Sequence, residues 1–216
     1  MMPEWLQIVI LSIYSIASLF NFAYSINQVN LTFLSKRKRN IDFLQWELGK
    51  EKDFPVVTIQ LPIYNELYVI ERLINAVCTI EWPKDKLEIQ VLDDSTDETS
   101  EMINELQKKW MQEGIDFKII RRENRTGYKA GALAYATPLA KGEFIALFDA
   151  DFIPNKDYLL KTIPFFKEDR VGVVQARWGH INENYSLLTQ LQALGLNTPF
   201  YVENKGRHLG NHFLNF

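Results

Sequence analysis

Two aspartates, Asp149 and Asp151, directly follow the apolar run IALF at residues 145–148. In an extended segment, residues two apart point to the same side, so both carboxylates face one volume. Two like charges about 5 Å apart repel by roughly 3 kcal/mol at an effective dielectric constant of 20. A solvated strand end tolerates this without any ligand. In a partly closed cleft, the pair is better explained by Mg²⁺ or Mn²⁺, which prefer oxygen ligands and bridge to phosphates.

A basic, glycine-containing segment, RRENRTGYKAGAL, occupies residues 121–133. Arg121, Arg122, Arg125 and Lys129 surround Gly127, and the sequence then becomes helical in character. Cationic side chains at the N-terminus of a helix favour a phosphate. A solvated basic turn, in which the glycines only serve backbone geometry, is the alternative. The segment matches neither the P-loop pattern nor G-x-G-x-x-G.

Two further segments carry polar groups that suit a nucleoside. PIYNE at 62–66 offers Tyr64 as a flat surface for a base and Glu66 as a hydrogen-bond acceptor, and DDSTDET at 93–99 offers further acceptors for a ribose hydroxyl or a uracil imide. A role for Asp93 in capping the turn is the alternative. Together with the cations and the paired carboxylates, these segments predict a site for a nucleoside diphosphate and a divalent cation.

These four segments each follow a predicted strand. From Phe54 onward, short β-rich runs alternate with helical periodicity, which is typical of a doubly wound α/β domain with a mostly parallel sheet. Ligands bind beyond the carboxyl ends of the strands in such sheets, so the segments are expected to meet at one edge. Asn65 is expected to cap the first helix and Thr96 the second. The predicted strands are 56–61, 87–92, 117–120, 144–148 and 171–175.

The first 35 residues differ from the rest, because no charged residue occurs between Glu4 and Lys36. About 20 helical residues at roughly 1.5 Å each cross a bilayer, and the KRKR run at 36–39 favours a cytoplasmic location for the residues after it. We therefore expect one N-terminal transmembrane anchor (1–35), a connector (36–53) and a cytoplasmic domain (54–216). A cleaved signal peptide and a buried helix of a soluble domain are the alternatives.

Composition excludes some classes of function. The formal net charge of -3 gives no electrostatic reason to expect nucleic-acid binding. Cys78 is the single cysteine, so no internal disulfide forms, and its amphipathic surroundings predict a packed core thiol. The three histidines do not share a metal-ligand spacing with a cysteine or an acidic motif, which disfavours a zinc site.

The segments PIYNE, VLDDSTDET, NRTGYKAGAL, FDADFIP and VGVVQARWGHIN together resemble the family 2 glycosyltransferases with a GT-A fold, from about Val56 to the end of the chain. Within that family the chain looks most like the membrane-bound cellulose synthase, mannan or glucomannan synthase-like branch, with ceramide glucosyltransferases more distant. The resemblance implies transfer of a hexose from a UDP- or GDP-sugar to a polysaccharide or glycolipid acceptor, with inversion and a divalent metal.

The resemblance also assigns roles to individual residues. Asp94, beside Asp93, matches the acidic contact to the uridine or ribose, and Lys129 with Gly131 matches the segment that holds the diphosphate. The metal ligands implied are Asp149 and Asp151. The nucleotide-binding residues implied are Pro62, Tyr64, Glu66, Asp93, Asp94, Lys129, Gly131 and Asp149.

The sequence departs from the family pattern at the catalytic base. An inverting transfer needs a general base, usually in a T-E-D-like motif, and processive members add Q-x-x-R-W; neither occurs before Phe216. QARW at 175–178 is one residue short, and Arg177 and Trp178 are instead candidates for facing the cleft. The chain therefore looks like the N-terminal portion of a longer enzyme, with the base expected beyond Phe216.

Three alternatives stay open at this point. The first is a truncated module that binds a nucleotide sugar without turnover, and the second is lipid glycosylation like that of ceramide glucosyltransferases. The third is a nucleotidyltransferase, which would need a glycine-rich basic loop after the first strand, where this sequence has PIYNE instead.

Overall fold

The structure is a computed structural model that describes residues 2–37, 53–210 and 212. Most of the connector expected at 36–53 lies outside these residues. The chain divides into two compact units, one formed by Met1–Asp42 with Gln175–Phe216 and the other by Phe43–Val174. The domain expected at 54–216 is therefore shared between the two units, and each unit is described by itself.

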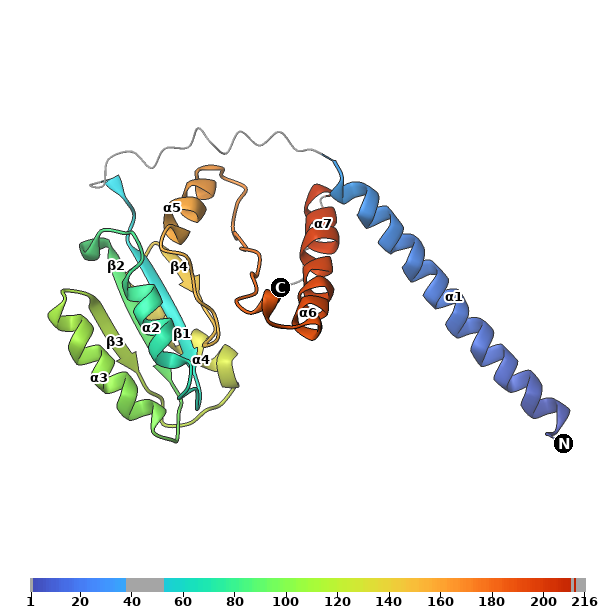
Figure 1. The fold of residues 1–216 in the computed structure, drawn as a ribbon, viewed down its shortest axis with the longest axis horizontal. Helices are drawn as coiled ribbons and strands as arrows, with labels where there is room; N and C mark the ends of the chain where they lie inside the picture. Colours follow the sequence, from blue (N-terminus) through green and yellow to red (C-terminus); the bar gives the residue numbers. More distant parts are fainter. Residues whose placement is uncertain (1, 38–52, 211, 213–216) are drawn as a thin grey trace. The chain divides into compact units, whose positions relative to one another are not determined.

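The second unit contains a four-stranded parallel sheet in the order β3-β2-β1-β4 (Figure 1). Val57 of the central strand β1 pairs with Leu87 of β2 on one side and with Phe144 of β4 on the other. This confirms the predicted parallel α/β sheet. The strands are β1 (Val57–Ile63), β2 (Leu87–Asp93), β3 (Asp116–Ile120) and β4 (Phe144–Leu147).

Helices and single helical turns connect the strands and follow the last one. The α-helices are α2 (Ile70–Cys78), α3 (Thr99–Gln112), α4 (Tyr128–Ala136) and α5 (Tyr158–Thr162). The 3₁₀ turns are η3 (Lys84–Lys86), η4 (Thr137–Leu139) and η5 (Ile163–Lys167).

One face of the sheet is apolar and forms the main core. Alternate residues of the central strands, including Ile59 and Ile89, are fully buried against Ile74 of α2 and Ile103 of α3. Cys78 at the end of α2 belongs to this core, and burial raises the pKa of its thiol to about 12. The prediction of a packed core thiol is confirmed.

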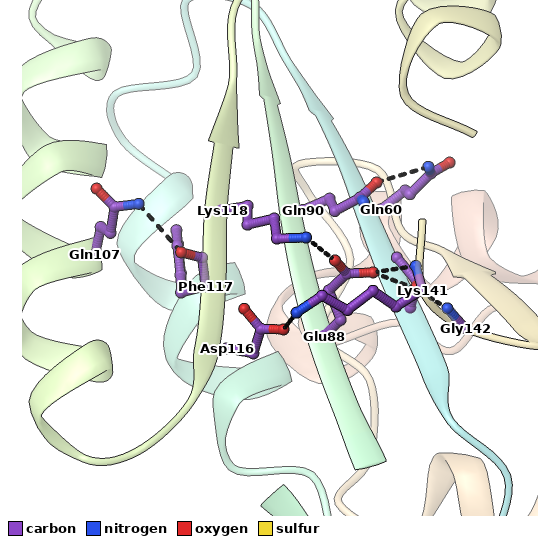
Figure 2. A network of polar contacts seen from close by, with 10 residues as sticks. Gln60, Glu88, Gln90, Gln107, Asp116, Phe117, Lys118, Lys141 and Gly142 are labelled. Carbon is purple, nitrogen blue, oxygen red and sulfur yellow. Dashed lines mark hydrogen bonds and ion pairs between the residues drawn. The ribbon is translucent and has the colours of Figure 1, made fainter. Parts of the chain in front are cut away.

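The other face of the sheet carries a buried polar ladder. Thr58 of β1 donates a hydrogen bond of 2.6 Å to Glu88 of the paired strand β2. Gln60 of β1 donates one of 2.9 Å to Gln90 of β2 (Figure 2). Burial alone would raise the pKa of Glu88, but hydrogen bonds from Lys118, the Lys141 backbone N–H and Thr58 together lower it. The ladder thus fixes the loop that leads into β4.

Both helix starts differ from prediction because the expected caps bond to each other's loop. Asn65 has a left-handed backbone (φ 56°), and its side-chain oxygen accepts a 2.8 Å hydrogen bond from the Thr96 N–H. The helices begin later, at Ile70 and Thr99, and the side chain of Asp97 accepts from the Thr99 N–H. The predicted caps Asn65 and Thr96 were wrong, since these residues instead tie together the loops after β1 and β2.

The fifth predicted strand, 171–175, was also wrong. Residues 171–180 have no regular secondary structure, and Val173 is exposed. A strand is stabilised by its ladder of hydrogen bonds, and β4 pairs with β1 alone among the strands of the described sheet. The β-rich composition of the segment does not supply that partner.

The first unit contains one long helix, α1 (Glu4–Ser35), which is apolar and long enough to cross a membrane by length and composition. It packs against α7 through Gly206, where an added Cβ would lie 2.5 Å from the Leu31 carbonyl oxygen, and Gln28 donates a 2.8 Å hydrogen bond to Glu203 in the turn that precedes α7. The other elements of this unit are η6 (Glu183–Tyr185), α6 (Leu187–Thr198), the π-helical turn η7 (Pro199–Asn204) and α7 (Lys205–Leu209).

Arg177 and Trp178 lie in this first unit and contact aromatic rings of η7. The Arg177 guanidinium lies 4.7 Å from the centre of the Tyr201 ring, and Trp178 packs on Phe200 with 5.2 Å between ring centres. Their expected role at the cleft stays a prediction.

Candidate functional site

The carboxyl ends of the sheet strands form a pocket of about 420 Å³ in the second unit. It brings together seven of the nine residues predicted for the site, from the ends of β1 and β2, from α4 and from the segment after β4. Asp93 and Gly131 do not line it. The seven that do are Pro62, Tyr64, Glu66, Asp94, Lys129, Asp149 and Asp151.

Asp149 and Asp151 lie in a turn rather than in an extended strand. β4 ends at Leu147, one residue earlier than expected, and the Phe152 N–H donates to the Asp149 carbonyl at 3.0 Å. Ala150 between them is buried and lines the same pocket, whereas an extended segment would turn it to the opposite side. The two carboxylates nevertheless reach one volume, because the turn places the whole D-x-D segment on the pocket wall.

The two carboxylates have different partners. Asp149 forms an ion pair with Lys129, and both side chains are about half exposed. Asp151 is exposed, and within the described part of the chain no salt bridge to it is found. Lys129 therefore balances the charge of Asp149.

The donor atoms of this pair fit a hard divalent cation that is shared with a ligand. Carboxylate oxygens are ligands that Mg²⁺ and Mn²⁺ accept. No group of three or more His, Cys, Asp or Glu side chains able to hold a metal occurs among the residues that the structure describes. An ion at Asp149 and Asp151 would thus need further oxygens, such as those of a diphosphate.

Asp94 forms an ion pair with Arg122 of the basic loop. Arg122 Nε donates to Asp94 Oδ1 at 3.0 Å, and its Nη2 donates to Oδ2. The hydrogen bond to Asp94 raises the pKa of Arg122. Arg122 also donates to the carbonyl oxygens of Thr126 (2.9 Å) and Tyr128 (3.2 Å), so the same side chain fixes the shape of the loop.

Asp93 does not line the pocket, and both of its carboxylate oxygens accept hydrogen bonds from neighbouring residues. Its Oδ1 accepts from the Ser95 N–H at 3.0 Å, and its Oδ2 accepts from Ser100 and Arg121 at 2.8 Å each. The side chain has no exposed surface. The geometry matches the capping alternative, while a contact of Asp93 with a nucleotide stays a prediction.

Gly131 contributes through packing. The basic loop turns into α4 through two left-handed residues, Gly127 (φ 74°) and Tyr128 (φ 50°), and then lies against Gly131. A Cβ at Gly131 would lie 2.0 Å from the Thr126 carbonyl oxygen, closer than any side chain allows. Glycine at 131 therefore lets the loop fold back on the first turn of α4, the turn that carries Lys129.

Arg125 lines the pocket, although it was predicted only as one cation of the basic segment and not among the nine site residues. Its guanidinium carbon lies 3.3 Å from the centre of the Tyr64 ring and 5.1 Å from that of Tyr128. The sequence shows a cation in a basic segment but not the ring on which it stacks. Arg125 lies before α4, which begins at Tyr128, so helical spacing gave no signal for this contact.

Known proteins resemble this chain in sequence and in fold. The family model described as glycosyl transferase family 2 matches residues 58–215. Glucomannan 4-beta-mannosyltransferase 1 of Cyamopsis tetragonoloba is 42% identical over 173 residues, which cover 78% of this chain and 33% of that protein. Probable glucomannan 4-beta-mannosyltransferase 1 of Arabidopsis thaliana is 37% identical over 220 residues, which cover 97% of this chain and 40% of that protein.

The solved structure of a mannosyltransferase from Pyrobaculum calidifontis in complex with GDP-Man and Mn²⁺ superposes with a TM-score of 0.59 at 24% identity, covering 76% of this chain and 46% of that one. This likeness shows the GT-A fold. The chain spans about a third of the length of the curated relatives that it matches first. The match of the family model over most of the chain and the identity to these relatives show that the chain belongs to the family 2 glycosyltransferases.

Proposed function

We propose that this chain carries the donor site of a divalent-metal-dependent, inverting glycosyltransferase, which transfers a hexose from a UDP- or GDP-sugar to a polysaccharide or glycolipid acceptor. One observation carries the proposal. A single pocket is lined by an aromatic ring (Tyr64), acceptor carboxylates (Glu66 and Asp94), a cation at a helix start (Lys129) and the D-x-D pair.

Each of these side chains suits a different part of a nucleotide sugar. Tyr64 offers a surface on which a base can stack, and Glu66 and Asp94 can accept hydrogen bonds from ribose hydroxyls or base N–H groups. Lys129 in the first turn of α4 suits the diphosphate. A divalent ion bound by Asp149 and Asp151 would neutralise negative charge on the leaving diphosphate.

A mannosyl donor is the first to test, because the curated relatives are named glucomannan 4-beta-mannosyltransferases. We place the general base outside the residues that the structure describes. We propose that α1 is a membrane anchor and that the sheet unit lies on the cytoplasmic side, as the KRKR run favours. A donor-binding module without turnover is the second candidate, since each pocket residue given a role above binds the donor or the metal.

Titration calorimetry of the full chain in detergent tests the metal site. We expect GDP or UDP to bind at least about tenfold more tightly with Mn²⁺ or Mg²⁺ than with a chelator, and the variant Asp149→Ala/Asp151→Ala to lose this difference. The control Asp85→Ala/Asp169→Ala removes two exposed carboxylates outside the pocket and should keep it. If Asp149→Ala/Asp151→Ala binds the nucleotide with the same metal dependence as the wild type, these two residues are not the metal ligands.

A transfer assay separates the two candidate functions. The same chain is incubated with labelled GDP-mannose or UDP-glucose and an oligosaccharide acceptor. Sugar transfer by the chain excludes the binding module. Donor binding without transfer supports it.

A further inference from the structure

Arg125 stacks on Tyr64, the ring that is proposed above to carry the donor base. Its guanidinium carbon lies 3.3 Å from the centre of the ring, a distance at which the two flat groups are in direct contact. A guanidinium and a nucleobase both stack on aromatic rings. They cannot occupy the same ring face at the same time.

The loop that carries Arg125 is fixed, whereas hydrogen bonds do not hold its side chain. Arg122 bonds to the carbonyl oxygens of Thr126 and Tyr128, and Asn124 accepts from the Thr126 hydroxyl at 2.6 Å. Among the described residues, no hydrogen bond from the Arg125 side chain is found beside its stacking on the rings of Tyr64 and Tyr128. The side chain can therefore move without rearranging the loop.

Arg125 also differs from its neighbours in charge compensation. Arg122 is paired with Asp94, and Lys129 is paired with Asp149. Within the part of the chain that the structure describes, no carboxylate pairs with Arg125. Its charge is thus available to an anion that enters the pocket.

We propose that Arg125 is a placeholder for the donor base: it stacks on Tyr64 while the site is empty, and the arriving base displaces it toward the diphosphate. The inference rests on the proposed function, because it presumes a nucleoside diphosphate in this pocket. The inference makes Arg125 a positioning residue, which loses its stacking contact with Tyr64 and gains a charge contact with the diphosphate when the donor binds.

Calorimetry with a nucleoside and with its diphosphate separates stacking from charge. The probes are guanosine and GDP, or uridine and UDP, with Mn²⁺ present, and the variants are Arg125→Ala and Arg125→Lys. We expect both variants to bind the nucleoside about two- to fivefold more tightly, since neither presents a planar cation to Tyr64. We expect the diphosphate to bind about threefold or more weakly to Arg125→Ala, and at least as tightly as the wild type to Arg125→Lys, which keeps the charge.

Arg72→Ala is the matched control, because Arg72 is an exposed arginine on α2 away from the pocket, and circular dichroism checks that each variant folds. Weaker nucleoside binding by Arg125→Ala would mean that Arg125 covers the bound base, which overturns the placeholder. Tighter binding of both probes by Arg125→Ala overturns the charge contact, and unchanged binding of both probes by that variant shows that Arg125 has no role in donor binding. A wild-type chain that binds neither diphosphate overturns the proposed function, and the inference with it.

Discussion

At the scale of single residues, the sheet keeps one carboxylate almost completely buried. The side chain of Glu88 is 1% exposed and accepts hydrogen bonds from Thr58, Lys118 and the Lys141 N–H. Charge-assisted hydrogen bonds of this kind stabilise the ionised form and compensate for the loss of water. Because the partners come from β1, β3 and the loop before β4, this one residue joins three parts of the unit.

Glu88→Gln tests how much this carboxylate stabilises the unit. The pKa of Glu88 is lowered in the folded chain, so its stabilisation is present above the unfolded value of about 4.3 and is lost as the pH falls through the folded pKa. We expect the variant to lose about 1–3 kcal/mol at pH 7 and to lose less further stability than the wild type between about pH 5 and pH 3. Urea unfolding at several pH values measures both.

Glu101→Gln is the control for this experiment, since Glu101 is an exposed carboxylate on α3. It should leave the free energy of unfolding at pH 7 unchanged to within about 0.5 kcal/mol. If Glu88→Gln loses as much stability on acidification as the wild type does, the titration of Glu88 does not drive the acid sensitivity.

The residue types at the strand ends were enough to predict most of the pocket. Tyr64, Lys129 and Asp149 were predicted because an aromatic, a cation and a paired carboxylate each follow a strand, and parallel strands bring their carboxyl ends together. The sequence left two roles open for Asp93, and it could not decide between them, because the choice depends on hydrogen bonds from Ser100 and Arg121 on other elements. The stacking of Arg125 on Tyr64 was not predictable from the sequence, because the two residues lie far apart along the chain.

At the scale of elements, the start of α4 depends on one close approach of backbone to backbone. Gly131→Ala would place a Cβ 2.0 Å from the Thr126 carbonyl oxygen, so the loop must shift away from the helix. We expect a loss of about 1–3 kcal/mol of stability and weaker diphosphate binding, since Lys129 moves with the first turn. Thermal unfolding and calorimetry with GDP measure the two effects.

Gly195→Ala is the matched control, a helical glycine of α6 with no atom within 4 Å of an added Cβ. Alanine there should stabilise the helix by about 0.5–1 kcal/mol and leave GDP binding unchanged. Equal effects of the two substitutions would show that helix propensity, and not the contact with Thr126, determines the outcome at Gly131.

The elements themselves show which sequence signals are reliable. Alternating apolar runs predicted all four strands, because one sheet face is uniformly apolar and the register is set by that pattern. The helix starts were misplaced because a capping residue was assumed to act locally, whereas Asn65 and Thr96 bond across two loops. A fifth strand was predicted from the same kind of β-rich run, and the exposed Val173 shows that such a run does not by itself supply a pairing partner.

At the scale of the whole molecule, α1 is the feature that bears on localisation. Its 32 residues give a length of about 48 Å at 1.5 Å per residue, more than the roughly 30 Å of a hydrocarbon core. Side chains such as Ile13 and Ile16 are exposed along it. If α1 lies in a bilayer, these side chains are buried in lipid.

Ile13→Arg/Ile16→Arg tests this placement. Each arginine near the centre of a membrane span costs about 2.5–3.5 kcal/mol, so we expect a large fraction of the variant to leave the membrane on carbonate extraction. The control Met111→Arg/Leu139→Arg changes two similarly exposed apolar residues of the sheet unit and should stay in the membrane fraction. Equal extraction of the two variants would contradict a membrane span at α1.

The single cysteine gives the protein an internal reporter of its own opening. Cys78 is buried in the core, and with a thiol pKa of about 12 almost no thiolate is present at neutral pH. A thiol reagent can modify it only when α2 separates from the sheet, so the rate of labelling measures how often that separation occurs. Each pocket variant can thus be compared with the wild type in one reaction, which separates a lost ligand contact from a loosened fold.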